Sequence, residues 1–217
     1  MVVDTASGVT NWPAVEAIGT IAGVIVTLFA VVVALWGEEW KRWARRPMLQ
    51  TIVRDDPACC YKTPVSGGEA YFFRIWIENN GLDPAKDVQV FASKLWKRNG
   101  LGAFQTVEQF LPMFLLWTHQ QPPSPTLMGL HPHMGHHCDL GRFVNGRKDD
   151  PRFTLMVEVA PNTGWHKLEP GTYRLELAVA AANAAPRRCT IEISFAGEWF
   201  DDPEQMSRKG VAIKLVT

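Results

Sequence analysis

An apolar segment near the amino terminus, Ala17–Trp36, constrains the fold of this chain more than any other feature. No charged side chain occurs between Glu16 and Glu38. A helix rises about 1.5 Å per residue, so about 20 apolar residues cross a hydrocarbon core about 30 Å thick. Backbone groups inside lipid must bond to one another, which favours a helix even where β-branched residues are frequent. The sequence therefore predicts a transmembrane helix over residues 17–37.

The flanks of this segment predict its orientation. Residues 1–16 contain acidic side chains but no lysine or arginine. Positive residues stay on the cytoplasmic side, and tryptophans concentrate where a helix leaves the bilayer. We therefore expect a short extracytoplasmic tail (1–16), a basic juxtamembrane segment (38–47) and a cytoplasmic domain attached to the inner membrane. The basic segment contains Lys41, Arg42, Arg45 and Arg46, and indoles flank the span at Trp12, Trp36, Trp40 and Trp43.

Two other interpretations of the apolar segment fit less well. A cleaved signal peptide has a basic amino-terminal region and a shorter apolar core. A buried helix of a soluble domain is rarely apolar on every face over such a length. Within the span, Gly19 and Gly23 form a GxxxG pattern, in which small residues let two helices approach closely. The pattern indicates either dimerisation through the helix or two glycines without a partner.

Length, charge and cysteine content limit what the remainder of the chain can be. The 217-residue chain leaves residues 48–217 for one domain with a sizeable core. The 22 basic and 22 acidic residues give a net charge of zero, which argues against a nucleic-acid-binding surface. The cysteines suggest no secreted disulfide framework, which fits a reducing compartment. They are Cys59, Cys60, Cys138 and Cys189.

Alternating hydrophobicity predicts a mainly β domain. In Tyr71–Asn79, Phe73, Ile75 and Ile77 alternate with polar or amphipathic neighbours, as in a half-buried strand. Short strands separated by Gly, Pro and Asn turns are typical of antiparallel sandwiches and barrels. We expect an immunoglobulin-like antiparallel β-sandwich. Its other strands should be Met48–Arg54, residues 88–96, Leu111–Thr118, Asp139–Val144, Phe153–Ala160, Tyr173–Ala181, Arg187–Phe195 and Val211–Val216.

Two segments resemble parts of bacterial adhesion-type, immunoglobulin-like domains. Phe73–Leu95 (FRIWIENNGLDPAKDVQVFASKL) resembles their opening strand pair, and Leu168–Trp199 resembles a closing hairpin. The whole chain is similar in layout to small bacterial single-span membrane proteins with a cytoplasmic sandwich of unassigned activity. The resemblance implies a fold and brings no functional residues with it.

A histidine-rich segment is the densest group of potential metal ligands. Imidazole nitrogen and thiolate sulfur suit zinc, and a tetrahedral site needs three or four such ligands. The spacing matches no standard zinc motif. The alternative is a polar loop that enters a strand, with the cysteine packed in the core. The candidate ligands are His131, His133, His136, His137 and Cys138.

The sequence contains no motif of hydrolytic catalysis or of phosphate binding, so we expect no catalytic residues and no enzyme. The leading hypothesis is a membrane-anchored, non-catalytic module that docks a protein partner or a second copy of itself. A second hypothesis is a ligand-gated membrane effector, of a stress or phage-defence type, that oligomerises through the transmembrane helix. The third is a metal-binding sensor or enzyme that uses the segment His131–Cys138.

Overall fold

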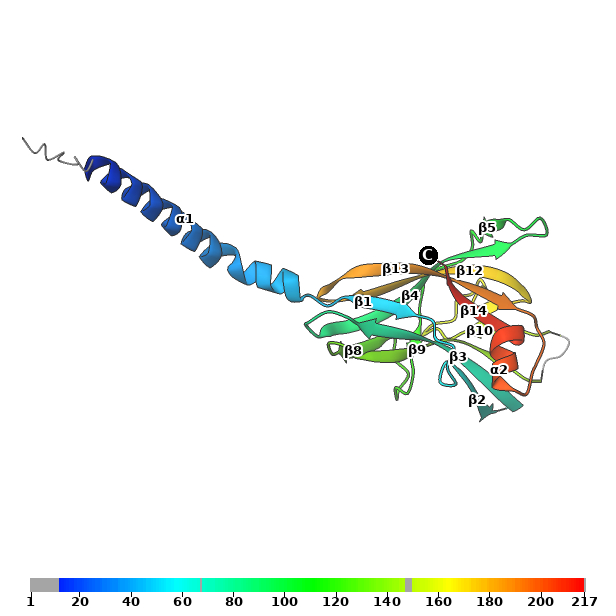
Figure 1. Cartoon of the computed structure of the whole chain (residues 1–217). Helices are drawn as coiled ribbons and strands as arrows, with labels where there is room; N and C mark the ends of the chain where they lie inside the picture. Colours follow the sequence, from blue (N-terminus) through cyan, green and yellow to red (C-terminus); the bar gives the residue numbers. More distant parts are fainter. Residues whose placement is uncertain (1–11, 67, 147–149, 217) are drawn as a thin grey trace, which may run out of the picture. The chain divides into compact units, whose positions relative to one another are not determined.

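The computed structural model describes residues 12–66, 68–146 and 150–216 (Figure 1). The chain divides into two compact units, one that ends at Arg45 and one that comprises Arg46–Thr217. The predicted extracytoplasmic tail lies outside the described residues, apart from its last part, which is helical.

The first unit contains one long helix, α1 (Trp12–Arg45). Its segment Gly23–Arg45 is long and apolar enough to cross a membrane and is not buried within the structure. The predicted apolar helix is therefore confirmed. It ends shortly before Pro47, because the residue preceding a proline is driven out of helical geometry.

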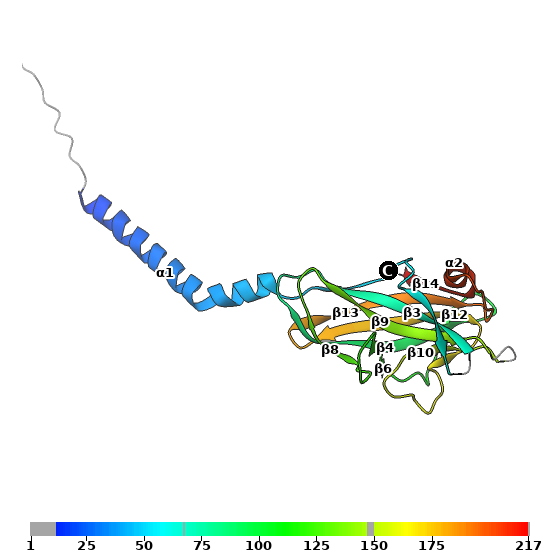
Figure 2. The ribbon, with the colours of Figure 1, turned by 90° about the horizontal axis from the view of Figure 1, so that it is seen from below.

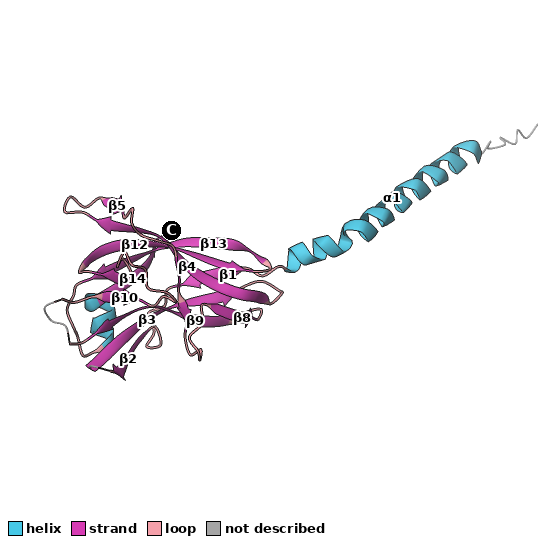
Figure 3. Cartoon of the chain, turned by 180° about the vertical axis from the view of Figure 1, so that it is seen from behind, coloured by secondary structure: helices cyan, strands magenta, loops and turns pink. Residues whose placement is uncertain are grey.

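The second unit consists of two antiparallel sheets (Figures 1 and 3). The first sheet has the order β1-β3-β9-β10-β11, with β2 beside β3 and β7 beside β9. Its strands are β1 (Leu49–Ile52), β2 (Cys60–Val65), β3 (Gly68–Asn79), β7 (Leu116–Trp117), β9 (Gly135–Val144), β10 (Phe153–Leu155) and β11 (Lys167–Leu168).

The second sheet has the order β14-β13-β12-β4-β5, with β6 and β8 beside β4. A short helix, α2 (Pro203–Gln205), and a π-helical turn (Met206–Gly210) precede its last strand. The strands are β4 (Ala85–Arg98), β5 (Phe104–Thr106), β6 (Met113–Phe114), β8 (Thr126–Leu130), β12 (Gly171–Ala181), β13 (Ala184–Phe195) and β14 (Val211–Val216).

Side chains from both sheets form one hydrophobic core. The predicted alternation of β3 is confirmed, because Phe73, Ile75 and Ile77 are buried while their neighbours are partly exposed. The strands β4, β12 and β13 obey the same pattern. Their buried members are Ala85, Val88, Val90, Ala92, Leu95, Tyr173, Leu175, Leu177, Val179, Ile191, Ile193 and Phe195.

Three predicted strands differ from the structure. Leu111–Thr118 is not one strand, because β6 pairs with β4 and β7 pairs with β9, so the segment passes from one sheet to the other. The strand predicted at Asp139–Val144 begins earlier, at Gly135. The strand predicted at Phe153–Ala160 ends at Leu155, and Val159 is 73% exposed instead of buried.

The two segments that resemble adhesion-type domains take different roles. Phe73–Leu95 joins β3 of the first sheet to β4 of the second sheet, so these strands are consecutive but not paired. Within Leu168–Trp199, β12 and β13 form an antiparallel hairpin whose register runs from Gly171 opposite Phe195 to Ala181 opposite Ala184. The predicted hairpin is confirmed.

Candidate functional site

The edge strand β14 presents an unpaired row of backbone groups. Ala196 N–H donates to Gly210 O at 2.9 Å, just before the β13–β14 register begins. Hydrogen-bonded and non-hydrogen-bonded pairs alternate along an antiparallel ladder. The N–H and C=O groups of Ile213 and Leu215 therefore point away from β13. Among the described residues, β14 has no strand on that side.

The edge strand β1 of the first sheet has the same property. Asn80 N–H donates to Met48 O at 2.8 Å, which makes these residues a hydrogen-bonded pair next to β1. By the same alternation, the backbone groups of Leu49 and Thr51 point away from β3. No described strand pairs with β1 on that side.

Both open edges line the same groove. The groove has a volume of about 600 Å³ and is bounded by Gln50–Asp56 on the first sheet and Val211–Leu215 on the second. Cys59, Cys60 and Phe73 also line it. A smaller hollow of about 370 Å³, which shares Thr51 and Leu215 with the groove, extends it along the same seam. The first volume lies within the roughly 300–1,000 Å³ that is typical of ligand sites.

One end of the groove is polar, and its charges are balanced by neighbours. The Arg54 guanidinium carbon lies 4.2 Å from the Trp76 ring centroid, and Arg54 Nη2 lies 3.4 Å from Glu78 Oε2. Arg208 lies 3.6 Å from Asp55. Because each arginine already has a carboxylate partner, this end offers a mixed polar surface and not a strong anion site.

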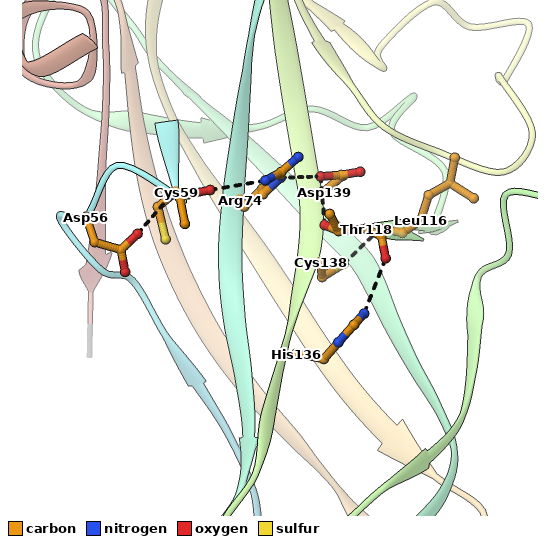
Figure 4. A network of polar contacts seen from close by, with 9 residues as sticks. Asp56, Cys59, Arg74, Leu116, Thr118, His136, Cys138 and Asp139 are labelled. Atoms are coloured by element: carbon orange, nitrogen blue, oxygen red, sulfur yellow. Dashed lines mark hydrogen bonds and ion pairs between the residues drawn. The ribbon is translucent and has the colours of Figure 1, made fainter. Parts of the chain in front are cut away.

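A polar network beneath the groove connects its wall to the middle of the first sheet (Figure 4). Arg74 Nε lies 3.0 Å from Asp139 Oδ1, and the two side chains are only 11% and 14% exposed. Arg74 also donates from its backbone N–H to Cys59 O at 2.9 Å. The Thr118 hydroxyl donates to the same Asp139 oxygen at 2.9 Å. The network fixes the turn before β2, which forms part of the groove wall.

The two cysteines of the groove are unreactive thiols. Burial is the main cause that raises the pKa of Cys59 to about 12, and Asp56 adds to the effect. Burial likewise raises the pKa of Cys60 to about 12. The thiolate is the nucleophilic form, so neither residue provides a nucleophile near neutral pH. The groove therefore has no activated nucleophile at either cysteine.

The structure separates the side chains of the candidate metal site. His136 and His137 lie next to each other on β9, so they point to opposite faces of the sheet. His136 Nε2 lies 3.2 Å from Thr118 O, whereas His137 packs edge-on against Trp76 with the ring centroids 4.7 Å apart. His131 and His133 are exposed before the strand.

The last candidate ligand, Cys138, is buried, and its Sγ contacts Leu116 O at 3.4 Å. Within the described ranges, no three His, Cys, Asp or Glu side chains form a group that could hold a metal ion. The zinc site stays a prediction that this arrangement does not support.

The predicted dimerisation pattern lies on α1. A Cβ atom at Gly23 would meet nothing within 4 Å, so this position of the helix surface is open. Gly19 belongs to the same helix, and dimerisation stays a prediction.

Acidification is expected to destabilise the protein through His137 and His166. Burial lowers the pKa of both below the ordinary value of 6.5, and Arg74 contributes at His137. The unfolded chain therefore binds protons at a pH where the folded histidines remain neutral, so the free energy of unfolding falls as pH falls below about 6.5. Denaturant titrations of the protein in detergent at pH 7.5 and 5.5 measure this effect.

A matched pair of variants tests whether His137 causes the pH dependence of the free energy of unfolding. His137→Phe keeps an aromatic ring against Trp76 and is expected to reduce the pH dependence, whereas His131→Phe, at an exposed position, is expected to leave it unchanged. Equal pH dependence in the wild type and in His137→Phe would refute the role of His137.

Comparison of the chain with protein-family models, with curated proteins and with solved structures finds no match. The sequence does not predict the groove. The apolar residues of Val211–Val216 predict a strand, but nothing local to them indicates that this strand lies at a sheet edge opposite β1.

Proposed function

We propose that this protein is a membrane-anchored docking module. In this proposal α1 crosses the inner membrane, and the immunoglobulin-like β-sandwich binds an extended segment of a partner protein in the cytoplasm. The basic residues after the span support the orientation, by the positive-inside rule. The observation that carries the docking function is that the open edges of β1 and β14 line a single groove.

Strand addition is the binding mode that fits these edges. An added strand forms main-chain hydrogen bonds with an exposed edge, and its alternate side chains enter pockets that give specificity. Ile213 and Leu215 offer outward N–H and C=O groups, as argued from the β13–β14 register. The adjoining walls are apolar at Val53 and Phe73. The preferred ligand is therefore an extended segment with apolar residues at alternate positions.

The edge also has features that limit indiscriminate pairing. β14 is short, and it carries the exposed cation Lys214. Short strands and edge lysines are the means by which native proteins prevent edge-to-edge aggregation. A partner must therefore supply a segment that matches the groove, which is the behaviour of a specific docking site.

Ile213→Pro is expected to weaken binding of such a segment about tenfold or more, because proline removes an outward donor and blocks close approach. The substitution leaves the β13 ladder intact, since the Ile213 N–H points away from β13. Ile213→Val is the matched control, because it keeps the N–H group and a β-branched side chain. Peptides selected from a displayed random library against the detergent-solubilised protein serve as the probe, and their affinities are measured by calorimetry.

Two results would overturn the proposal. One is a library selection that enriches no extended apolar peptide. The other is equal affinity of the enriched peptides for wild type and for Ile213→Pro, with unchanged thermal stability. If added peptide instead dissociates a dimer of the protein, the natural occupant of the groove is a second copy of this chain.

A further inference from the structure

The last turns of α1 carry two opposed faces beyond the apolar segment. Trp36, Trp40 and Trp43 recur at the i, i+4 and i+7 positions that share one helix face. Their side chains are 57%, 73% and 67% exposed. Lys41 and Arg45 are also four residues apart, and at 100° per residue they lie on the opposite face. This segment, residues 36–45, is amphipathic, whereas the preceding turns are apolar on all sides.

The position of these faces along the helix matches the layers of a bilayer. If residues 17–36 fill the hydrocarbon core, Trp40 and Lys41 lie about 6–8 Å beyond it. The headgroup region on one side of a bilayer is about 5–8 Å thick. Figure 2 shows that the C-terminal part of α1 runs in a different direction from its N-terminal part. Lys41 is then at the depth of the lipid phosphates, and the long side chain of Arg45, about 13–14 Å beyond the core, points back along the helix toward them.

We infer that residues 36–45 form a binding site for anionic phospholipid headgroups. Indole rings occupy the interface between acyl chains and headgroups, while the opposed ammonium and guanidinium groups face the phosphates. Glu38 lies 3.2 Å from Lys41, but both side chains are 73% exposed, so this pair is weak and leaves the lysine available to phosphate. The sequence adds Arg42 to the same short segment.

This inference rests on the proposed membrane crossing, and it goes beyond topology. The positive-inside rule requires only that basic residues remain in the cytoplasm, in any bilayer. A headgroup site requires that the protein retain anionic lipids in preference to neutral ones. A basic residue near an anionic surface enriches such lipids about fivefold.

The test uses the full-length protein in nanodiscs with equal amounts of phosphatidylglycerol and phosphatidylcholine. Native mass spectrometry of the protein released from the discs counts the lipids that remain bound. The wild type is expected to retain phosphatidylglycerol in excess, and Lys41→Gln with Arg45→Gln is expected to lose most of that excess. The swap Lys41→Arg with Arg45→Lys should restore it, since it preserves both charges. Lys209→Gln with Lys214→Gln, an equal loss of charge in the β unit, should leave the excess unchanged.

Carbonate extraction of proteoliposomes distinguishes the membrane crossing from the headgroup site. A protein that resists extraction but retains both lipids equally would overturn the headgroup site and leave the crossing intact. Retention of the excess by Lys41→Gln with Arg45→Gln would also overturn it. A protein that carbonate extracts would overturn the crossing and the lipid site together.

Discussion

Replacing Asn79 by alanine is expected to lower the free energy of unfolding by about 3 kcal/mol or more, because each buried polar group left without a partner costs about 1–3 kcal/mol. Asn79 is fully buried at the end of β3. Its Oδ1 accepts hydrogen bonds from the backbone N–H groups of Met48 and Gly81, both at 3.0 Å. Its Nδ2 donates to the carbonyl oxygens of Asp83 at 2.8 Å and Leu130 at 3.0 Å.

These four bonds use the full capacity of an amide side chain. They join the residue before β1, the turn between β3 and β4, and the end of β8, so one side chain holds three separate segments together. Water cannot easily replace it, because Asn79 has no exposed surface. Asparagine is therefore required here for its geometry, and aspartate would fail as well, since it has no N–H group to donate.

Thermal and denaturant unfolding of the full-length protein in detergent, followed by near-UV circular dichroism of the tryptophans, measures the effect. The matched control is Asn80→Ala. Asn80 is exposed and makes one side-chain bond, from Nδ2 to Gln50 Oε1 at 2.8 Å. Its replacement is expected to change the free energy of unfolding by less than about 1 kcal/mol. Equal destabilisation by the two substitutions would show that the buried bonds of Asn79 are not responsible.

Asn79 also illustrates how far local sequence reasoning extends in this chain. The pair Asn-Gly after an alternating strand predicts a turn, and a turn is present. The bonds to Met48 and Leu130 join residues 31 and 51 positions away, and no local pattern encodes them. Alternation and apolar length are properties of short windows, so the helix and the long strands β3, β4, β12 and β13 could be predicted.

Features that depend on how the strands are arranged in space could not be predicted. Leu111–Thr118 is mostly apolar, which is compatible with one buried strand. In the structure its later residues are buried where the segment passes from one sheet to the other, with Leu115 paired in an isolated bridge to Val157. The sequence leaves two interpretations of the histidine-rich segment open, a converging metal site and a polar loop that enters a strand with the cysteine in the core. Pairing with β3 makes Gly135–Val144 a strand with Cys138 buried, which is the second interpretation.

The groove between β1 and β14 belongs to the same class of features. It exists because two strands distant in the sequence, β1 and β14, end up as neighbouring sheet edges. Gly135 is a local sequence feature related to this arrangement. A Cβ atom at this position would overlap the Trp76 ring of the neighbouring strand β3. That glycine lets the ring lie flat on β9, but its role is visible only once β3 and β9 are paired.

The ion pair beneath the groove is expected to give the second large effect. Removal of one partner of a buried pair costs about 3–5 kcal/mol, because the remaining charge is left without compensation. Arg74→Met and Asp139→Leu should each show a loss of this order, since the two side chains are 11% and 14% exposed. Asp139→Leu also removes the acceptor of the Thr118 hydroxyl.

The double variant, Arg74→Met with Asp139→Leu, separates the pair from its surroundings. With both charges absent, no charge remains unpaired in the sheet, so the double variant is expected to be more stable than the sum of the single losses predicts, by about 1–3 kcal/mol. Denaturant unfolding of the wild type, the two single variants and the double variant in one detergent gives the four free energies of unfolding that a double-mutant cycle needs. Strict additivity would mean that Arg74 acts through its bond to Ala58 O, at 3.3 Å, and not through Asp139. In that case the groove wall is ordered by the turn before β2 alone, and the middle of the first sheet contributes nothing to it.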